Sequence, residues 1–242
     1  MLPEIHWFGP GYDDAHYPDG QPETVIVYVH GWGVKWPSKG LFVDIARYLA
    51  TKGHTSALFD MSDFDAGGNA TFLPLTDQQD RLRAVIGLVQ SIYPGVKIAF
   101  VAHSLGCRVL ASLYPELERL IYKAFFLAPA VGMRHGGFMN YMARKHNAWQ
   151  DADGLKFYRK DGTISLVPNR FMQEFDRDWD TIYERELHKP NNTIILAESD
   201  ARTADQDKML AACGAITLQA SDHNFTGSSR ASLAELIATQ LA

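Results

Sequence analysis

Cysteine, long apolar runs and excess positive charge are all scarce in this sequence. Its 242 residues include two cysteines, Cys107 and Cys213, and no C-x-x-C pair that would indicate a zinc or redox motif. We expect two reduced thiols in a cytoplasmic protein. No stretch approaches the roughly 18 apolar residues of a membrane-spanning helix. The first residues lack the basic start and apolar run of a signal peptide.

The charge balance excludes further classes of partner. The formal net charge is −5, whereas nucleic-acid-binding proteins usually carry a basic face. A chain with net negative charge is also not attracted electrostatically to an anionic membrane surface. The histidines His135, His146 and His188 lack the spacing of metal ligands. We therefore expect no nucleic-acid partner, no stable membrane insertion and no metal.

What the chain does contain is the pattern of one large globular domain. Apolar residues make up 46% and charged residues 21%, which is ordinary for a soluble protein. Short β-branched runs alternate with segments of helical periodicity, and this predicts an α/β fold with a doubly wound, mostly parallel sheet. The expected strands are 24–29, 55–59, 97–102, 122–127, 193–197 and 215–218. The expected helices start near Ser38, Thr76 or Asp77, Ser104, Ala204 and Ser229, and Pro115 is expected to end the third of them.

The alternation stops between about Gly132 and Pro190. We expect a core formed by 1–131 and 191–242 and a cap or lid insertion at 132–190, since so long an interruption is usually functional. Within it, Asp161-Gly162 between two short apolar runs predicts a hairpin, and Asn169 can cap a helix that continues to about Leu187. The insertion is rich in large rings, which suit an apolar pocket. The expected substrate-binding residues are Trp32, Phe138, Tyr141, Trp149, Phe171 and Phe175.

A candidate nucleophile follows the strand at 97–102. The run Ala102-His103-Ser104-Leu105-Gly106 resembles the G-x-S-x-G nucleophile elbow, with alanine in place of the first glycine. The elbow is a tight turn from strand to helix that exposes the serine hydroxyl above the sheet. Small residues are needed beside the serine because strand and helix nearly touch there. Ser104 is therefore the predicted nucleophile.

A serine needs a base, and the base needs an orienting acid. His223 follows the last expected core strand and is the only histidine after Asp200. Asp200 closes the run I-I-L-A-E-S-D and is the predicted acid, with Glu198 as the rival carboxylate. His30 and His103 are expected to pack or hydrogen-bond behind the site.

The oxyanion that forms during acyl transfer needs donors already in place. His30-Gly31-Trp32-Gly33 follows the first apolar strand and resembles the H-G-x oxyanion loop of hydrolases with this elbow. We predict that the backbone N–H groups of Trp32 and Leu105 form the oxyanion hole. The alternative is that the glycines only make a turn.

From Val25 to the end, the chain resembles the α/β-hydrolase superfamily, and in particular its small bacterial carboxylesterases and monoacylglycerol lipases. The resemblance implies a cap over the site, ester hydrolysis through an acyl-enzyme, and no cofactor. Two features depart from the usual pattern. A glycine-rich D-x-x-G-x-G turn commonly follows the strand that ends at Asp60, but here the sequence reads D-M-S-D-F-D-A-G-G. Cys107-Arg108 stands where a second glycine is frequent.

The resulting hypothesis is a serine hydrolase that cleaves small-molecule carboxylic esters of small or medium acyl chain, as a monomer or small homo-oligomer. The same triad also serves hydrolases of carbon–carbon bonds, amides and thioesters, because fold and triad do not fix the substrate. A non-catalytic hydrolase-fold protein that binds a ligand is the third hypothesis.

Overall fold

The computed structural model describes residues 3–131, 142, 147–175, 179–200 and 207–242. Its main sheet runs in the order β13-β12-β8-β7-β3-β4-β1-β2. The strands from β13 to β4 are parallel to one another, whereas β1 and β2 form an antiparallel hairpin at the edge. The predicted doubly wound, mostly parallel sheet is thus confirmed.

The main-sheet strands are β1 (Ile5–Gly9), β2 (Tyr12–Ala15), β3 (Thr24–Val29), β4 (Thr55–Phe59), β7 (Lys97–His103), β8 (Ile121–Leu127), β12 (Asn192–Ala197) and β13 (Ile216–Leu218). The helices are α1 (Leu41–Ala50), α2 (Leu75–Ile92), α3 (Gly106–Leu117), α5 (Asn169–Phe175), α6 (Trp179–Leu187), α7 (Asp207–Ala212) and α8 (Ser228–Leu241), with a 3-10 turn at Ser38–Gly40. The remaining strands are β5 (Ser62–Phe64), β6 (Ala70–Phe72), β9 (Trp149–Gln150), β10 (Gly154–Tyr158) and β11 (Ile164–Pro168).

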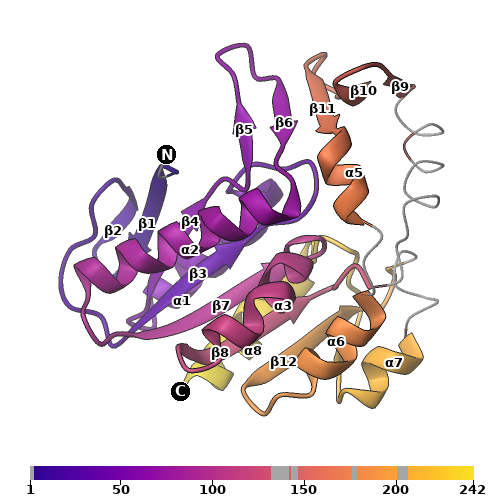
Figure 1. Ribbon diagram of the computed structural model, residues 1–242. Coiled ribbons are helices and arrows are strands. Elements are labelled where there is room, and N and C mark those ends of the chain that lie inside the picture. Colours follow the sequence, from indigo (N-terminus) through magenta and orange to yellow (C-terminus); the bar gives the residue numbers. More distant parts are fainter. Residues whose placement is uncertain (1–2, 132–141, 143–146, 176–178, 201–206) are drawn as a thin grey trace.

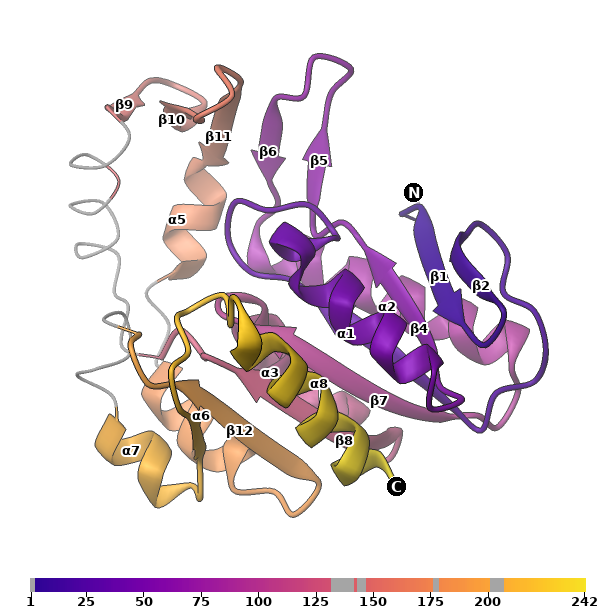
Figure 2. The same cartoon turned by 180° about the vertical axis from the view of Figure 1, so that it is seen from behind.

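Helices cover both faces of the main sheet. Figure 1 shows α2, α3 and α6 in front of the sheet. Figure 2, seen from the opposite side, shows that α1 and α8 cover the other face. Every residue of β3 is buried, as expected for a parallel strand with a helix on each side. Alternate side chains of the strand enter two separate cores, with Val25 and Val27 in one and Ile26 and Tyr28 in the other.

A second sheet stands beyond the carboxyl ends of the main strands, in the order β5-β6-β11-β10-β9. Its hairpin β5–β6 comes from the segment after β4, where the sequence departs from the usual glycine turn. Its other strands come from the insertion. β10 and β11 form the expected antiparallel hairpin around Asp161-Gly162, and β11 pairs in parallel with β6 through Ser165–Ala70 and Leu166–Thr71.

The end of the insertion belongs to the main core. Trp179, Tyr183 and Leu187 of α6 are buried in the same cluster as residues of α2 and α3. The expected single helix from Asn169 is described as two, α5 and α6. α6 has an apolar face at helical spacing, and this face packs into the main core. The predicted boundary at 190 therefore separates two segments that share one hydrophobic core.

Two local expectations were wrong at helix ends. Ser38 does not cap α1; Gly40 precedes it in a left-handed conformation with φ of 85°, which glycine adopts without a steric penalty. Pro115 does not end α3, which continues to Leu117. A proline removes one helical hydrogen bond, and the buried side chains of Leu113 and Leu117 on either side of it keep this helix packed.

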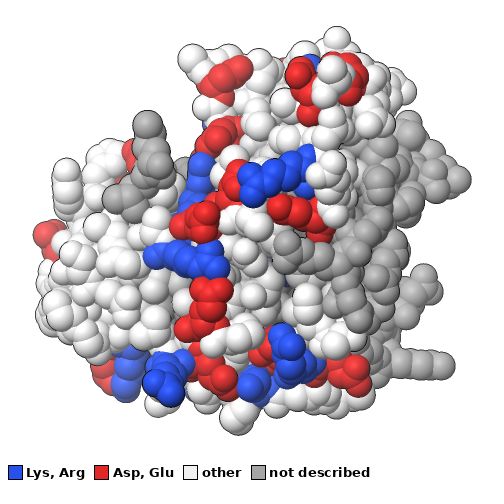
Figure 3. Space-filling model, in the orientation of Figure 1, with Lys and Arg blue, Asp and Glu red and all other residues white. Residues whose placement is uncertain are grey.

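Charges on the face shown in Figure 3 are mixed in sign. Arg83 pairs with Asp80 and with Glu116, which joins α2 to α3. Among the described residues, no helix is both long enough and apolar enough to cross a membrane.

Candidate active site

Ser104 occupies a strained turn between β7 and α3. Its φ is 54°, a value that residues with a side chain rarely adopt outside functional turns. The turn is held on both sides: the Ser104 N–H donates to the Leu127 carbonyl at 2.9 Å, and the Ser104 carbonyl accepts the Cys107 N–H at 3.1 Å. The strain is thus balanced by hydrogen bonds of the flanking elements.

The turn leaves no room for side chains on its glycines. A Cβ on Gly106 would lie 2.2 Å from the carbonyl oxygen of Val29, at the end of β3. A Cβ on Gly31 would lie 2.9 Å from the Ser104 Cβ and 3.4 Å from the Leu105 nitrogen. The predicted oxyanion loop therefore lies directly against the predicted nucleophile elbow.

The three predicted triad residues meet, although they come from distant parts of the chain. His223 Nε2 lies 3.0 Å from Ser104 Oγ, and His223 Nδ1 lies 2.5 Å from Asp200 Oδ2. Asp200 and His223 are buried, whereas Ser104 is partly exposed. The carboxylate accepts from Nδ1–H, so Nε2 carries the lone pair that can accept the serine proton.

Backbone and side-chain contacts decide between the two candidate carboxylates. Glu198 follows β12 directly, and its Oε2 accepts the N–H of Ala220 at 2.7 Å. Its side chain therefore points to the loop after β13 and not to the histidine ring. Asp200 lies two residues further on, beyond the turn closed by its own N–H and the Ala197 carbonyl. The geometry places Asp200, and not Glu198, beside His223.

The loop that carries His223 is held by a carboxylate and a second histidine. Asp222 accepts the N–H groups of Asn224 and Thr226 and the Thr226 hydroxyl. Burial alone would raise the pKa of the Asp222 carboxyl, but these hydrogen bonds bring that pKa below its ordinary value. The His103 Nε2–H donates to the His223 carbonyl at 2.8 Å. As expected, His103 lies behind the site.

His30 also lies behind the site, where it joins two loops. Its Nε2 accepts the Met61 N–H at 2.8 Å, and its Nδ1–H donates to the Gly31 carbonyl at 2.9 Å. Burial lowers the pKa of His30 to about 4, so the ring is neutral and Nε2 can accept. The oxyanion loop is thereby fixed to the segment after β4.

An aromatic cluster covers the oxyanion loop. The Trp32 ring stacks on Phe72 at 3.8 Å with an interplanar angle of 7°, and Phe171 lies 5.5 Å from it. Phe157 completes the cluster at 6.2 Å from Trp32. Leu105 packs against the same group. Both predicted oxyanion residues therefore direct their side chains to the second sheet.

The remaining expected pocket residues are placed differently. Trp149 lies at the exposed edge of the second sheet, 5.3 Å from Tyr158, and outside the cluster around Trp32. Phe138 and Tyr141 lie outside the described residues, as does the side chain of Phe175. Phe72 was not predicted. Its signal was the pair of short runs around Gly67-Gly68, a segment that stood out in the sequence only as a departure from the usual glycine turn.

A small cavity adjoins Leu105, with room for about 20 Å³. Such a volume holds about one water molecule. Its walls combine apolar and charged side chains, namely Leu75, Gln78, Leu105, Arg108, Val109, Phe171, Glu174 and Trp179. The buried Arg108 donates to the carbonyls of Ala130 and Val131 and lies over the Trp179 ring. Arg108, which replaces a small residue of the usual pattern, thus ties α3 to the segment after β8.

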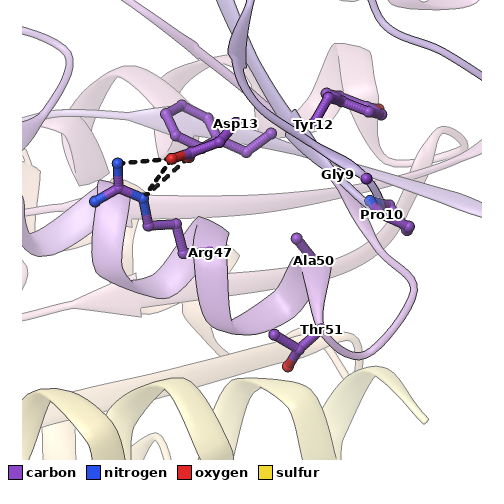
Figure 4. Close-up of a pocket in the computed structure, with 9 residues that line it drawn as sticks. Gly9, Pro10, Tyr12, Asp13, Arg47, Ala50 and Thr51 are labelled. Atoms are coloured by element: carbon purple, nitrogen blue, oxygen red, sulfur yellow. Dashed lines mark hydrogen bonds and ion pairs between the residues drawn. The ribbon is translucent and has the colours of Figure 1, made fainter.

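A larger cavity of about 330 Å³ lies between hairpin β1–β2 and the end of α1. Its two charged residues pair with each other, since Arg47 donates to both oxygens of Asp13 (Figure 4). α1 ends at the side where the parallel strands begin, opposite Ser104.

In the described part of the chain, no group of three or more His, Cys, Asp or Glu residues could hold a metal ion.

The sequence matches no protein-family model and no curated protein. The structure, in contrast, is similar to solved hydrolases along nearly the whole chain. Est1E from Butyrivibrio proteoclasticus has 14% identity and a TM-score of 0.64, with 98% of this chain and 93% of that chain covered. The monoacylglycerol lipase of Paleococcus ferrophilus has 13% identity and a TM-score of 0.66, with 99% and 100% covered. A serine hydrolase from Xanthomonas campestris described as lacking a lid has 15% identity and a TM-score of 0.59, with 98% and 87% covered. This chain has the α/β-hydrolase fold.

Proposed function

We propose that the protein is a serine hydrolase that cleaves carboxylic esters of small or medium acyl chain. Ser104 is the nucleophile, His223 the general base and Asp200 the acid that orients the imidazole. The backbone N–H groups of Trp32 and Leu105 stabilise the oxyanion. The reaction uses only groups of this chain and water, so it requires no cofactor.

The reaction proceeds in two halves. Ser104 Oγ attacks the ester carbonyl while His223 Nε2 takes the hydroxyl proton, and the carbonyl oxygen becomes an oxyanion between the two N–H groups. As the tetrahedral intermediate collapses, the ester C–O bond breaks and His223 protonates the leaving alkoxide. A water molecule, deprotonated by His223, then attacks the acyl-enzyme. The carboxylic acid leaves and Ser104 recovers its proton.

The observation that carries this proposal is the hydrogen-bonded series from Ser104 Oγ through His223 to Asp200, at 3.0 Å and 2.5 Å. A serine beside a base that is itself oriented by a third group is the geometric signature of an activated nucleophile. The similarity of the structure to a monoacylglycerol lipase agrees with ester substrates. We also propose that the second sheet, which combines hairpin β5–β6 with strands of the insertion, covers this site.

Substitution of the nucleophile tests the proposal. Ser104→Ala should abolish hydrolysis of p-nitrophenyl esters and labelling by a serine-directed fluorophosphonate. The reason is that Ser104 Oγ is the hydroxyl from which His223 Nε2 takes the proton in the proposed mechanism. Losses for a triad serine reach about a millionfold. The control is Ser91→Ala, at an exposed serine of α2, which should behave as the parent. More than about a hundredth of the parent's activity in folded Ser104→Ala would contradict the assignment.

A panel of p-nitrophenyl esters with increasing acyl length, run beside thioester and anilide analogues, tests the substrate class. The proposal expects the highest kcat/KM for short or medium oxygen esters. A thioester or anilide cleaved faster than every oxygen ester would assign the same triad to another bond.

A further inference from the structure

Hairpin β5–β6 is attached to the oxyanion loop at several points. At its base, the Met61 N–H donates to His30 and the Asp60 carboxylate accepts the Trp36 N–H at 2.6 Å. At its end, Phe72 stacks on Trp32. The loop from His30 to Trp36 is thus held at both of its ends and at Trp32 by the hairpin and the two residues that precede it.

Among the described rings around Trp32, Phe72 makes the closest contact. The two rings are nearly parallel, at 7°, with centroids 3.8 Å apart, whereas Phe157 and Phe171 lie 6.2 Å and 5.5 Å from Trp32. Phe72 is 4% exposed, and its Cζ would lie 4.0 Å from a Cβ on Gly33. One buried ring therefore supports the indole and approaches the following glycine.

Phe72 is itself held in place by the second sheet. Its strand β6 pairs with β5 on one side and with β11 on the other. Asn69, just before β6, accepts the Ile164 N–H at 2.8 Å and donates to the Asp65 carboxylate at 2.9 Å. Phe72 therefore lies on a strand that is paired on both sides. A side chain on a rigid element of this kind can fix the position of the group that it contacts.

We propose that Phe72 is a positioning residue for the oxyanion hole: it holds the Trp32 side chain, and through it the Trp32 N–H, at the place where the oxyanion forms. This inference rests on the proposed function. It gives a role to the hairpin that replaces the usual glycine turn. Phe72 does not touch the reacting atoms, so its effect must pass through Trp32.

The expected effect is a loss of transition-state stabilisation. Removal of one oxyanion donor costs about 10² to 10³ in kcat in a well-studied serine protease. A donor that is displaced, and not removed, should cost less, on the order of tenfold. An interaction made only in the transition state lowers kcat with little change in KM, whereas a pocket wall would change KM and its dependence on acyl length.

The test compares Phe72→Ala with Tyr158→Ala. Tyr158 is an aromatic residue of strand β10 in the same sheet, but it is 56% exposed and its ring lies beside Trp149, outside the cluster around Trp32. For a short p-nitrophenyl ester, Phe72→Ala should lower kcat about tenfold at nearly constant KM. It should slow phosphonate inactivation equally, since the phosphoryl oxygen occupies the oxyanion hole as Ser104 Oγ displaces the leaving group. Tyr158→Ala should match the parent. Equal kcat in Phe72→Ala and the parent, or a change confined to KM, would overturn the inference.

A double-mutant cycle separates this role from general packing. Because Phe72 acts through the indole, Phe72→Ala should have no further effect on kcat in a Trp32→Leu background. Multiplicative losses would overturn the inference. Phe72→Leu, which retains most of the buried volume, serves the same cycle if Phe72→Ala does not fold. A parent protein that neither hydrolyses esters nor reacts with the phosphonate would refute the proposed function. An active parent whose kcat is unchanged by Phe72→Ala would instead refute only the role of Phe72.

Discussion

The side chains around Ser104 divide into those that could react and those that hold them. His223 contacts both the serine hydroxyl and the Asp200 carboxylate. His30 and His103 instead form hydrogen bonds with backbone groups of the surrounding loops. These contacts favour a supporting role for His30 and His103, whereas the proposed base, His223, lies in a loop near the end of the chain.

The choice between two neighbouring carboxylates gives a prediction. Asp200→Asn should lower kcat by orders of magnitude, because the amide favours the wrong imidazole tautomer; the corresponding loss in a serine protease is about 10⁴. Glu198→Gln should have a small effect, since Glu198 accepts a backbone N–H in another loop. Steady-state kinetics of the two purified variants test this ranking, and the reverse order would identify Glu198 as the acid.

Sequence reasoning could predict that Ser104, Asp200 and His223, the proposed triad, lie together because each of them follows a strand. The carboxyl ends of parallel strands lie at one edge of the sheet, so residues after β7, β12 and β13 are brought together by topology alone. Phe72 could not be predicted in the same way. It depends on a pairing between β6 and β11, segments almost a hundred residues apart, and no local pattern encodes such a pairing.

At the scale of elements, the nucleophile depends on close contact between the end of β3 and the start of α3. Gly106→Ala should be strongly destabilising, because its Cβ would lie 2.2 Å from a backbone carbonyl oxygen that cannot rotate away. Gly87→Ala in α2 is the matched control: nothing lies within 4 Å of its Cβ. It should stabilise the protein by about 0.5–1 kcal/mol through reduced chain entropy.

Urea unfolding of the two variants measures the difference. We expect a lower midpoint for Gly106→Ala, or no folded protein, and a slightly higher midpoint for Gly87→Ala. A Gly106→Ala variant as stable as the parent would mean that the elbow can open without cost, against the close contact described above.

The parallel strands of the main sheet, β3, β4, β7, β8, β12 and β13, were predictable to within a residue, whereas β1, β2, β5 and β6 were not. Strands β3 and β4 are continuous apolar runs because both of their faces are covered. Hairpin β1–β2 and strands β5 and β6 lie at edges or in the small sheet, and they contain polar residues such as Asp13 and Asp63 on exposed faces. Their formation follows from pairing with neighbours, so composition alone did not distinguish them from loops.

The whole molecule is joined across the boundary that the sequence suggested. The second sheet combines a hairpin of the core segment with strands of the insertion, and α6 packs on α3 within the main core. The ion pair of Arg170 with Asp77 and the hydrogen bond from the Thr76 hydroxyl to Glu174 further link α5 to α2. The apolar cluster of the second sheet is also shared with the core segment, because Phe72 belongs to it and Trp32 and Leu105 pack against it.

This arrangement predicts one cooperative unfolding transition. Trp32 reports on the joint between the sheets and Trp179 on the packing of α6, while far-UV circular dichroism follows the helices of the core. In urea, tryptophan fluorescence and circular dichroism should therefore change with the same midpoint and the same slope, as in a two-state transition. A cap with its own stability would lose the fluorescence of Trp32 at lower urea than the helical signal. Measuring the fluorescence transition again in Trp179→Phe assigns it to Trp32 and the other remaining indoles. A separate early transition in that variant would contradict the single unit, and would make the second sheet an independently unfolding lid over Ser104.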